Sequence, residues 1–395
     1  MRSNDLFFTN VFETMNRRER LMATMRGETV DRPPVCFYEL NGLDQNPDDP
    51  DPFNIFSGPS WKPLIELARD RTDRIVLREL IFGKILPDPV EGLASKETFI
   101  KNGSEYTIRK IKAGNRILTS RERRDPDINT VWTEEHLIKD LDDLRAFLNL
   151  PEPELVTGVD KAPVIDAEEA LGDSGIVMLD TADPLCLAAM MFDMADYTII
   201  AMTEQDLFTQ LLDRFAATLL PRVEEIAKAL PGRLWRIYGP EYASAPYLPP
   251  YLFNDYVCKY IEPMIASIHR HGGFARVHSH GNLKGILDMI VSTGAMGLDP
   301  VEPPHQGDVE LEYVRKNYGK DLVLFGNLEV ADIENMPPVQ FEEKVKRALE
   351  EGTAGEGRGF VLMPSASPSG RQISPYTLPN YEKMVELTEK WPQMR

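Results

Sequence analysis

The chain has few cysteines and a deficit of basic residues, and each shortage excludes classes of protein. Three cysteines stand far apart among 395 residues, in no CxxC pair, so we expect no disulfide framework. Lysine and arginine total 44 against 63 acidic residues, which gives a formal net charge of −19. Nucleic-acid binding needs a basic face, so this balance argues against such a partner. The arginines near the start, Arg17, Arg18 and Arg20, are expected to lie on the solvated face of a first helix.

Long apolar runs are also missing from the sequence. No stretch approaches the roughly 20 apolar residues that span a bilayer, and the N-terminus has no apolar run followed by small residues. We therefore expect no membrane partner, no secretory signal and a cytoplasmic location. Hydrophobic residues at 42% and charged residues at 27% are typical of a globular protein with a large core.

From Gly175 onward, short apolar runs alternate with amphipathic stretches. Alternation at this spacing predicts parallel strands joined by helical crossovers, and the number of units favours a closed barrel over an open sheet. A doubly wound sheet would need a phosphate-binding GxGxxG after an early strand, and none is placed that way. The predicted strands are 32–40, 74–79, 175–180, 233–238, 274–278, 297–300, 322–325 and 359–363.

We therefore predict the α/β class, with a single (β/α)8 TIM barrel over the whole chain, 1–395. Residues 1–31 are predicted as an N-terminal helical extension. Two alternating runs flank Gly114–Asn115, a hairpin signal that predicts a β-hairpin excursion at about 104–122. The long amphipathic helix predicted over 204–230 would offer a face for a homodimer.

In a barrel of this kind the active site lies at the carboxyl ends of the strands. Polar residues gather at those ends in this sequence. We expect a substrate-binding role for Tyr38, Glu39, Tyr238, Asn327 and Ser365. For Asn327 and its neighbour Glu329 two readings stay open, because they would either order other site residues or cap the helix that follows.

The histidines are unevenly distributed along the sequence. Five of the six histidines lie between His269 and His305. His278 and His280 stand two apart on a predicted strand and so face the same side. Neutral imidazoles suit zinc, and Glu241, from another strand end, would complete a catalytic site with one open position. An HxH pair is a weak motif, so an alternative stays open in which both histidines only form hydrogen bonds with neighbouring loops.

Two carboxylates are candidate catalytic residues. Glu302 stands in the apolar, proline-rich segment VEPPH, where burial would raise the pKa of its carboxyl and suit it as a general acid or substrate anchor. An ordinary loop carboxylate is the alternative. Asp180, at the end of the strand predicted over 175–180, would position substrate or shuttle a proton.

Several segments resemble, in the expected order, the uroporphyrinogen decarboxylase-like superfamily. The segments are NRRERLMATMRGETVDRPP, TADPLCLAAMMFDMADYTI, GPEYAS, HSHGNLKGILDMIVSTGAMGLDPVEPP, LVLFGNLE and GRGFVLMPSASP. True decarboxylases of this superfamily act on tetrapyrrole acetate groups and carry an arginine-rich RQAGRY-like motif. Here the first predicted strand runs into the acidic YELNGLDQNPDDPDP, which lacks that motif. The resemblance therefore points to the other branch, the cobalamin-dependent methyltransferases.

Membership of that branch implies methyl transfer from a small O-methyl or methylamine compound to a corrinoid, free or on a partner protein, with zinc as the Lewis acid. The zinc ligands of the branch include an HxC pair and a later cysteine. His278 matches the histidine, His280 replaces the cysteine, and the later position falls among serines such as Ser365. These departures replace soft thiolate ligands by the harder ligands Glu241, His278 and His280. With this ligand set, both retention and loss of the metal stay open.

Two other readings stay open at this point. A metal-free barrel would decarboxylate a tetrapyrrole or small acid, with Asp180 or Glu302 stabilising developing positive charge. A barrel without chemistry would be a binding module. Metal content and sensitivity to chelators separate these readings from the zinc methyltransferase.

Overall fold

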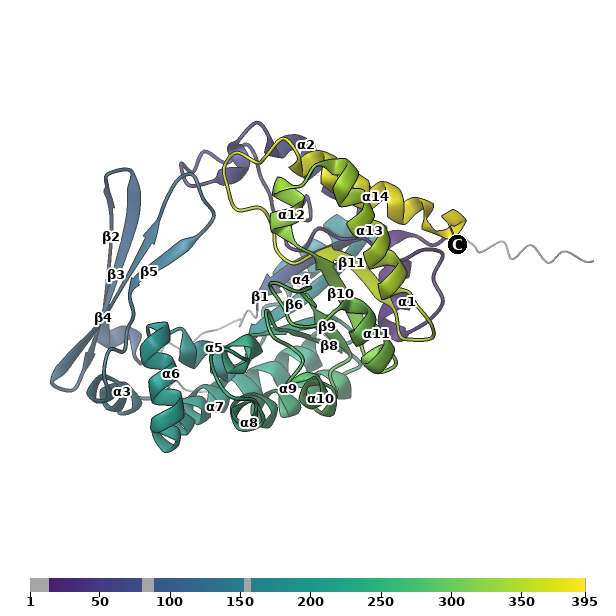
Figure 1. The fold of residues 1–395 in the computed structure, drawn as a ribbon. Coiled ribbons are helices and arrows are strands. Elements are labelled where there is room, and N and C mark those ends of the chain that lie inside the picture. The colour runs from purple at the N-terminus through teal and green to yellow at the C-terminus, as the bar shows by residue number, and fades with distance from the viewer. Residues whose placement is uncertain (1–13, 80–88, 153–157, 395) are drawn as a thin grey trace, which may run out of the picture.

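The computed structural model describes residues 14–79, 89–152 and 158–394 (Figure 1). Seven parallel strands form a curled sheet in the order β1-β6-β7-β8-β9-β10-β11. The arrangement is that of a TIM-barrel-like α/β fold. The strand bounds are β1 Arg74–Glu79, β6 Gly175–Ala182, β7 Leu234–Tyr238, β8 Phe274–His278, β9 Gly297–Asp299, β10 Val323–Leu328 and β11 Phe360–Pro364.

The prediction of a strand over 32–40 is wrong, and within the described residues the parallel sheet has seven strands where eight were expected. Val35 makes one parallel bridge to Leu362 of β11, and the amide of Asp73, just before β1, donates to the carbonyl of Val35 at 2.7 Å. The segment therefore lies between β11 and β1, at the eighth position. It forms no longer ladder because the prolines before Val35 have no N–H to donate, and Tyr38 turns the chain with a φ of 52°.

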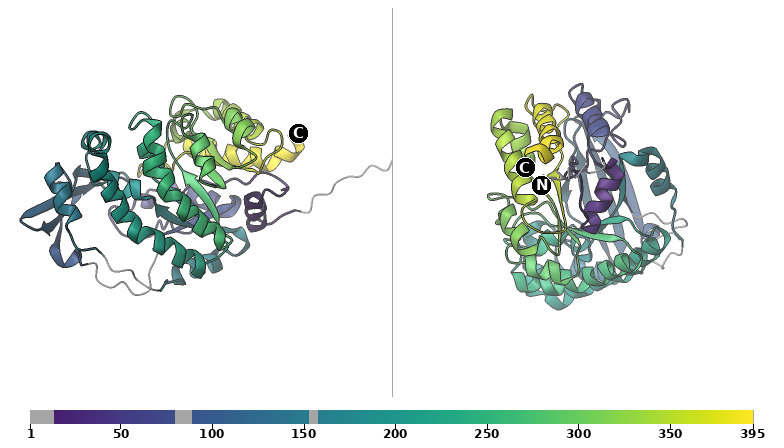
Figure 2. Two further views of the ribbon diagram at one scale, coloured as in Figure 1. Left: turned by 90° about the horizontal axis from the view of Figure 1, so that it is seen from below. Right: turned by 90° about the vertical axis from the view of Figure 1, so that its right-hand side faces the viewer.

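Helices connect the strands and pack outside the sheet, with α7 beside α9 and α13 beside α14 (Figure 2). In the described part of the chain, no helix combines the length and apolarity needed to cross a membrane. The helix bounds are α1 Arg17–Arg26, α2 Trp61–Arg71, α3 Leu141–Leu148, α4 Ala162–Leu171, α5 Pro184–Ala189, α6 Met194–Thr203, α7 Gln205–Ala229, α8 Pro250–Phe253, α9 Lys259–Arg270, α10 Leu287–Ser292, α11 Leu311–Tyr318, α12 Val330–Asn335, α13 Pro338–Gly352 and α14 Thr377–Met394.

A second, antiparallel sheet is inserted between β1 and β6. Its strands are β2 Ala94–Lys101, β3 Ser104–Ala113, β4 Arg116–Arg124 and β5 Val131–Glu135, paired in sequence order. The predicted hairpin corresponds to β3 and β4, which turn at Gly114 with a φ of 61°. The excursion is larger than that hairpin, because it adds a strand on each side. Figure 1 shows this sheet at one end of the molecule, near α3, α5 and α6.

The interior of the curled sheet is apolar at its N-terminal end. A compact cluster there takes side chains from the strands and from α1, which covers that end. Inward-facing side chains alternate along each strand, as the two-residue period of a strand requires. The cluster consists of Leu21, Met25, Cys36, Ile75, Ile176, Met178, Leu234, Val323, Phe325, Val361 and Met363.

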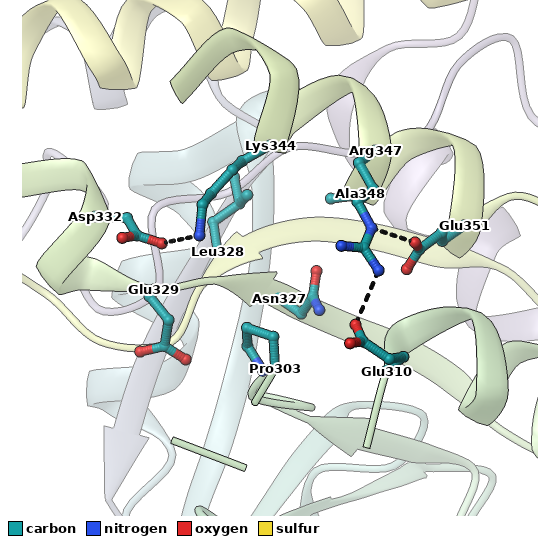
Figure 3. A pocket seen from close by; sticks show the side chains of 10 residues that line it. All are labelled: Pro303, Glu310, Asn327, Leu328, Glu329, Asp332, Lys344, Arg347, Ala348 and Glu351. Atoms are coloured by element: carbon teal, nitrogen blue, oxygen red, sulfur yellow. Dashed lines mark hydrogen bonds and ion pairs between the residues drawn. The ribbon is translucent and has the colours of Figure 1, made fainter. Parts of the chain in front are cut away.

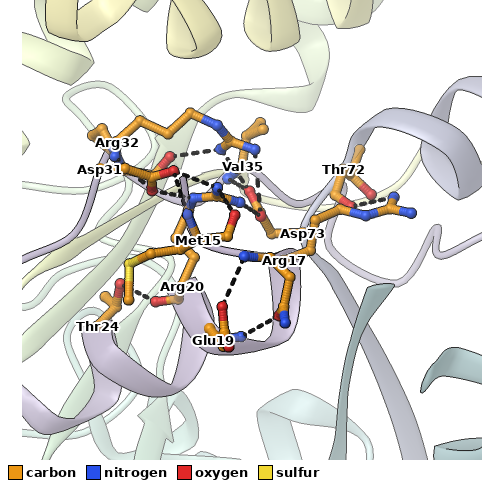
Figure 4. A network of polar contacts seen from close by, with 12 residues as sticks. Met15, Arg17, Glu19, Arg20, Thr24, Asp31, Arg32, Val35, Thr72 and Asp73 are labelled. Atoms are coloured by element: carbon orange, nitrogen blue, oxygen red, sulfur yellow. Dashed lines mark hydrogen bonds and ion pairs between the residues drawn. The ribbon is translucent and has the colours of Figure 1, made fainter. Parts of the chain in front are cut away.

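A buried ionic network holds α1 against this end of the sheet (Figure 4). Asp73 is fully buried; its Oδ1 accepts from Arg20 and its Oδ2 accepts from Arg32, each at 2.7 Å. The amide of Val35 also donates to Asp73 Oδ2, at 2.9 Å, and Arg20 pairs with Asp31 at 2.6 Å. Arg20 is thus buried, and the prediction that it lies on a solvated face is wrong.

Candidate functional site

Strand register places polar side chains in layers at the C-terminal edge of the curled sheet, which we call the mouth. Asp180 of β6 pairs in register with Arg236 of β7, and Arg236 pairs with Arg276 of β8. Two residues further on, Tyr238 pairs with His278, which pairs with Asp299 of β9. The apolar interior therefore gives way to a charged layer and then to the layer that contains His278.

Arg236 is the centre of a saturated cluster. Its guanidinium donates to both oxygens of Asp180, each at 2.7 Å, to the hydroxyl of Tyr38 at 2.7 Å and to Glu39 at 3.2 Å. Burial is the largest single influence and opposes the charge of Arg236, but the hydrogen bond with Asp180 and the charges of Asp180 and Glu39 contribute to a net rise in the pKa of the guanidinium. Because Arg236 occupies both oxygens of Asp180, that residue acts in this structure as the partner of an arginine. The guanidinium also lies 5.6 Å from the ring centre of Tyr238.

His278 belongs to a buried triad with Asp299 and Arg276. The Nδ1 of His278 lies 2.7 Å from Asp299 Oδ2, and Arg276 Nε lies 2.8 Å from the other oxygen. Burial would raise the pKa of Asp299, but the positive charge of Arg276 and the bond with His278 lower it. An ionised carboxylate accepts only, so Nδ1 of His278 carries the proton. Its Nε2 then faces the hydroxyl of Tyr38, at 3.4 Å.

His280 forms a second pair, with Glu302. Its Nδ1 lies 2.8 Å from Glu302 Oε1, and the amide of Gly281 donates to the other oxygen at 2.7 Å. Burial is the largest single influence and disfavours the charged imidazole, but the bond with Glu302 and the negative charges of Glu302, Glu241 and Asp299 together outweigh it and raise the pKa of His280. The predicted rise in the pKa of Glu302 is wrong: burial acts in that direction, but the hydrogen bond from His280 and its positive charge lower the pKa.

The two imidazoles lie side by side, as the spacing of the HxH pair predicts. The ring centres of His278 and His280 are 4.6 Å apart and the rings are nearly perpendicular, at 89°. Each ring turns its Nδ1 to a carboxylate, an arrangement that fixes the ring orientation. His280 is the more accessible of the two, with 38% of its side chain exposed against 6% for His278.

The three residues expected to bind zinc do not form a ligand set in this arrangement. Among residues 14–79, 89–152 and 158–394, no group of three or more histidine, cysteine, aspartate or glutamate side chains is placed to hold a metal ion. Glu241 lies on a short turn after β7, and its buried Oε2 has no hydrogen-bond partner among the residues that the structure describes. Zinc binding by Glu241, His278 and His280 therefore stays a prediction.

The ends of β10 and β11 place Asn327, Glu329 and Ser365 at the mouth. The hydroxyl of Ser365 donates to Glu329 Oε2 at 3.2 Å. Burial and the nearby charge of Glu302 raise the pKa of Glu329 to about 7. Glu329 occupies the N-cap position of α12 but makes no side-chain capping bond, so the capping alternative fails for this residue.

Sequence reasoning missed Asp183, Arg236 and Arg276. Asp183 is fully buried; its Oδ1 accepts from the amide of Cys186 at 2.6 Å and caps α5, while its Oδ2 has no partner within the described chain. Burial, with a contribution from Glu241, raises the pKa of Asp183 well above its usual range. The signals were present: a cap residue in TADP, and arginines at inward positions of otherwise apolar strands.

Comparison with known proteins places the fold and the family. A solved methyltransferase from Methanosarcina mazei superposes with a TM-score of 0.57 and 16% identity, over 95% of this chain and 99% of that one. A D-psicose 3-epimerase gives a TM-score of 0.31 with 10% identity, over 60% of this chain and 92% of that one. No curated protein sequence matches the chain at a significant level.

A sequence model of one family matches the larger part of the chain. It is the model for uroporphyrinogen decarboxylase (URO-D), and it covers residues 140–391. The matched span contains β6 to β11 and, with them, both histidine–carboxylate pairs. The chain belongs to the uroporphyrinogen decarboxylase family.

Proposed function

We propose that the chain is a methyltransferase that takes a methyl group from oxygen in a small methylated compound and gives it to a corrinoid presented by a separate protein. The proposal rests on one observation: the accessible His280, bonded to Glu302, lies beside the buried pair of His278 and Asp299. Family membership and the likeness to a methyltransferase support an enzyme of this class. The corrinoid acceptor comes from the resemblance in sequence.

His280 has the properties of a general acid for this reaction. A methyl group leaves an ether oxygen without its bonding electrons, so negative charge develops on that oxygen. A proton on His280 Nε2 would neutralise the charge, and general acids of this kind contribute about 10²- to 10⁴-fold in rate. Glu302 holds the ring through Nδ1 and stabilises its protonated form. The ring of His278, bonded through Nδ1 to the ionised Asp299, lies beside the ring of His280.

The buried arginines at the mouth disfavour the decarboxylase alternative. Binding tetrapyrrole acetate groups calls for cations that are free to pair with carboxylates. Arg236 is already bound to Asp180 and Glu39, and Arg276 is already paired with Asp299. Neither is available to a polyanionic substrate without breaking a buried ion pair, which is costly.

The test supplies cob(I)alamin as the acceptor and 2-methoxyphenol as the donor, and follows methylcobalamin by absorbance. We expect transfer by the wild type and a rate about 10²- to 10⁴-fold lower for His280→Gln. His305→Gln is the matched control, because His305 is exposed, stands three residues after Glu302 and belongs to neither pair. Equal rates for His280→Gln and the wild type would contradict the role of His280 as general acid. Decarboxylation of uroporphyrinogen without methyl transfer would overturn the proposed reaction.

A further inference from the structure

A small cavity between the end of β10 and the helices α11 and α13 is closed by ion pairs (Figure 3). Its volume is about 80 Å³, well below the roughly 300 Å³ at which small-molecule sites begin. At its rim Lys344 contacts Asp332 at 2.6 Å, and Arg347 contacts Glu310 at 3.0 Å. Because the space is small and its cations are already paired, we assign no ligand to this cavity.

A larger cavity lies between the inserted antiparallel sheet and the helices α5 and α7. Its volume is about 380 Å³, which is within the range of small-molecule binding sites. Strands β3, β4 and β5 form one wall, while α5, α7 and the chain just after α5 form the other. No residue that we place at the mouth is among the described residues that line it, so it is a separate site. The lining residues are Val90, Arg109, Ile111, Ser120, Glu122, Thr133, His136, Leu137, Phe147, Leu187, Met190, Met191, Arg214, Phe215 and Thr218.

The inserted sheet presents one of its two faces to this cavity. Side chains two apart on a strand share a face, so Arg109 and Ile111 of β3 point to the same side. In the register of β3 and β4, Arg109 lies opposite Ser120 and Ile111 lies opposite Leu118. Ile111 and Leu118 are buried in a small apolar cluster against which Phe147 of α3 packs. The wall is therefore apolar next to α3 and becomes polar at Arg109 and Ser120.

Three polar side chains, those of Arg109, Ser120 and His136, form a row across this wall. Arg109 is the register partner of Ser120. On the other side of β4, Arg121 pairs with Glu135, the last residue of β5, and this pairing brings the next residue, His136, beside Ser120. Paired strands lie about 5 Å apart, so a ligand group held at Ser120 is within reach of both neighbours in the row.

The members of this row are available to a ligand. Within the described part of the chain, no hydrogen bond engages the hydroxyl of Ser120 or the imidazole of His136. Arg109 pairs with Glu91, but 38% and 60% of the two side chains are exposed. Exposed ion pairs contribute little free energy, so the guanidinium can exchange Glu91 for a ligand at small cost.

The rest of the lining is largely apolar, and its charges are mainly positive. The ring centres of Phe147 and Phe215 are 6.3 Å apart, and methionines such as Met190 adapt to irregular ligand shapes. A second arginine, Arg214, lies 5.4 Å from the ring centre of Phe147 and donates to two backbone carbonyls. Glu122 is the one carboxylate in the described lining, so arginines outnumber carboxylates and the balance favours an anion.

We propose that this cavity binds an organic carboxylate with an apolar body. The carboxylate would accept hydrogen bonds from Arg109, Ser120 and His136, three donors that suit a group able only to accept. The body would pack against Phe147 and Phe215, where the burial of apolar surface supplies affinity. The site lies away from the mouth, and its occupation does not depend on the methyl-transfer reaction.

Three probes with the same phenylpropyl body and different head groups test the inference: 3-phenylpropanoate, 3-phenylpropan-1-ol and 3-phenylpropylammonium. Ligand-detected NMR titration of the full chain at pH 7 measures their dissociation constants, which should lie in roughly the millimolar range for ligands of this size. We expect the carboxylate to bind at least about five-fold more tightly than the alcohol or the ammonium. A carboxylate that binds no more tightly than either of the others would overturn the proposal.

Arg109→Gln tests the contact with the head group. The variant breaks only an exposed ion pair, so the fold should persist. We expect the carboxylate to bind about five-fold more weakly and the alcohol to stay within about two-fold of the wild type. Lys110→Gln is the matched control, because Lys110 is the next residue of β3, is exposed and points to the opposite face; it should change neither. An equal loss in both variants, or no loss in Arg109→Gln, would overturn the head-group assignment.

Ser120→Trp tests the location of the body. The indole would occupy the cavity from its sheet wall, so we expect the carboxylate and the alcohol both to bind roughly ten-fold more weakly. Ile117→Trp, on the opposite face of β4 and 67% exposed, is the control and should leave binding unchanged. If Ser120→Trp does not fold, Thr218→Trp on α7 fills the cavity from the other wall. Unchanged binding in the filled variant would place the ligand elsewhere and overturn the proposal.

Discussion

The two edges of the curled sheet both bury acidic side chains, but they differ in whether the carboxylate oxygens have hydrogen-bond partners. At the N-terminal edge both oxygens of Asp73 are paired, with Arg20 and Arg32. At the mouth, Asp183, Glu241 and Glu329 each keep a buried oxygen that has no partner in the described chain. Satisfied networks stabilise a fold, whereas unsatisfied groups mark places where a protein gives up stability for function. The contrast supports the proposal that ligands bind at the mouth.

The largest expected effect is at the satisfied edge. Asp73→Ala would leave two buried arginines without their shared carboxylate, so we expect a loss of about 3–5 kcal/mol in the free energy of unfolding. Urea unfolding followed by circular dichroism measures it. Asp70→Ala, which removes an exposed partner of Arg69, is the matched control and should change stability little. A loss under 1 kcal/mol for Asp73→Ala would show that the network does not hold α1.

Replacing a buried aspartate at the mouth should increase the free energy of unfolding instead of lowering it. Asp183→Asn keeps a residue able to cap α5 and removes a carboxyl that burial penalises when charged, so we expect a gain of about 1 kcal/mol at pH 7. Because the folded pKa of Asp183 is raised, the cost is absent below the unfolded value of 3.8 and grows as the pH rises above it. The gain should therefore vanish near pH 4. Asp183→Ala, which loses the cap, should be destabilising, and a destabilised Asp183→Asn at pH 7 would contradict the account.

A smaller effect concerns the pair of His280 and Glu302. The raised pKa of His280 gives stability that is fully present below pH 6.5 and is lost as the pH rises through its folded value. The lowered pKa of Glu302 gives stability present above pH 4.5 and lost as the pH falls through its folded value. Glu302→Gln should thus cost most between about pH 4.5 and 6.5. Solvent screens the half-exposed His280, so we expect about 1 kcal/mol or less.

Chemical denaturation of the wild type and Glu302→Gln from pH 4 to 8 tests this window, and NMR titration of His280 gives its pKa directly. The pKa of His280 should fall in the variant. A cost that is independent of pH, or a His280 pKa that does not move, would show that the pair is not coupled.

The smallest effect lies away from both edges. Arg71 pairs with Glu389 at 2.6 Å, with 40% and 41% of the two side chains exposed. Ion pairs so exposed contribute little, and we expect Arg71→Ala to change the free energy of unfolding by about 0.5 kcal/mol or less. Thermal unfolding measures the change. A loss comparable to that of Asp73→Ala would erase the distinction between buried networks and surface pairs.

The sequence predicts most of the strands because buried parallel strands are short, apolar and regularly spaced. The segments predicted at 74–79 and 274–278 coincide with β1 and β8, and the others differ at their ends by a few residues. The failure at 32–40 has a local cause in its prolines and its turn at Tyr38. The second sheet was underestimated because β2 and β5 are largely exposed and carry little alternation of burial.

The location of the candidate site could be predicted from the sequence, but the hydrogen-bond partners of its residues could not. The position of His278 and His280 at a strand end predicts that they share a side, and their rings do meet. Which carboxylate each would bind depends on the register between β8 and β9 and on the loop that carries Glu302, which spacing does not reveal. For the same reason Asp180 could not be recognised from the sequence as the partner of Arg236.

The long insertion between β1 and β6 also bears on the order in which the chain assembles. Arg74 and Gly175 are neighbours in the sheet although about a hundred residues separate them, and Val35 meets Leu362 across more than three hundred. Strands β6 to β11 follow one another directly and can pair as they leave the ribosome, whereas β1 and residues 34–37 must wait for distant partners. The curled sheet is therefore completed last, when synthesis reaches β11. Until then residues 34–37 have no β11 to pair with, and they must not pair with other strands.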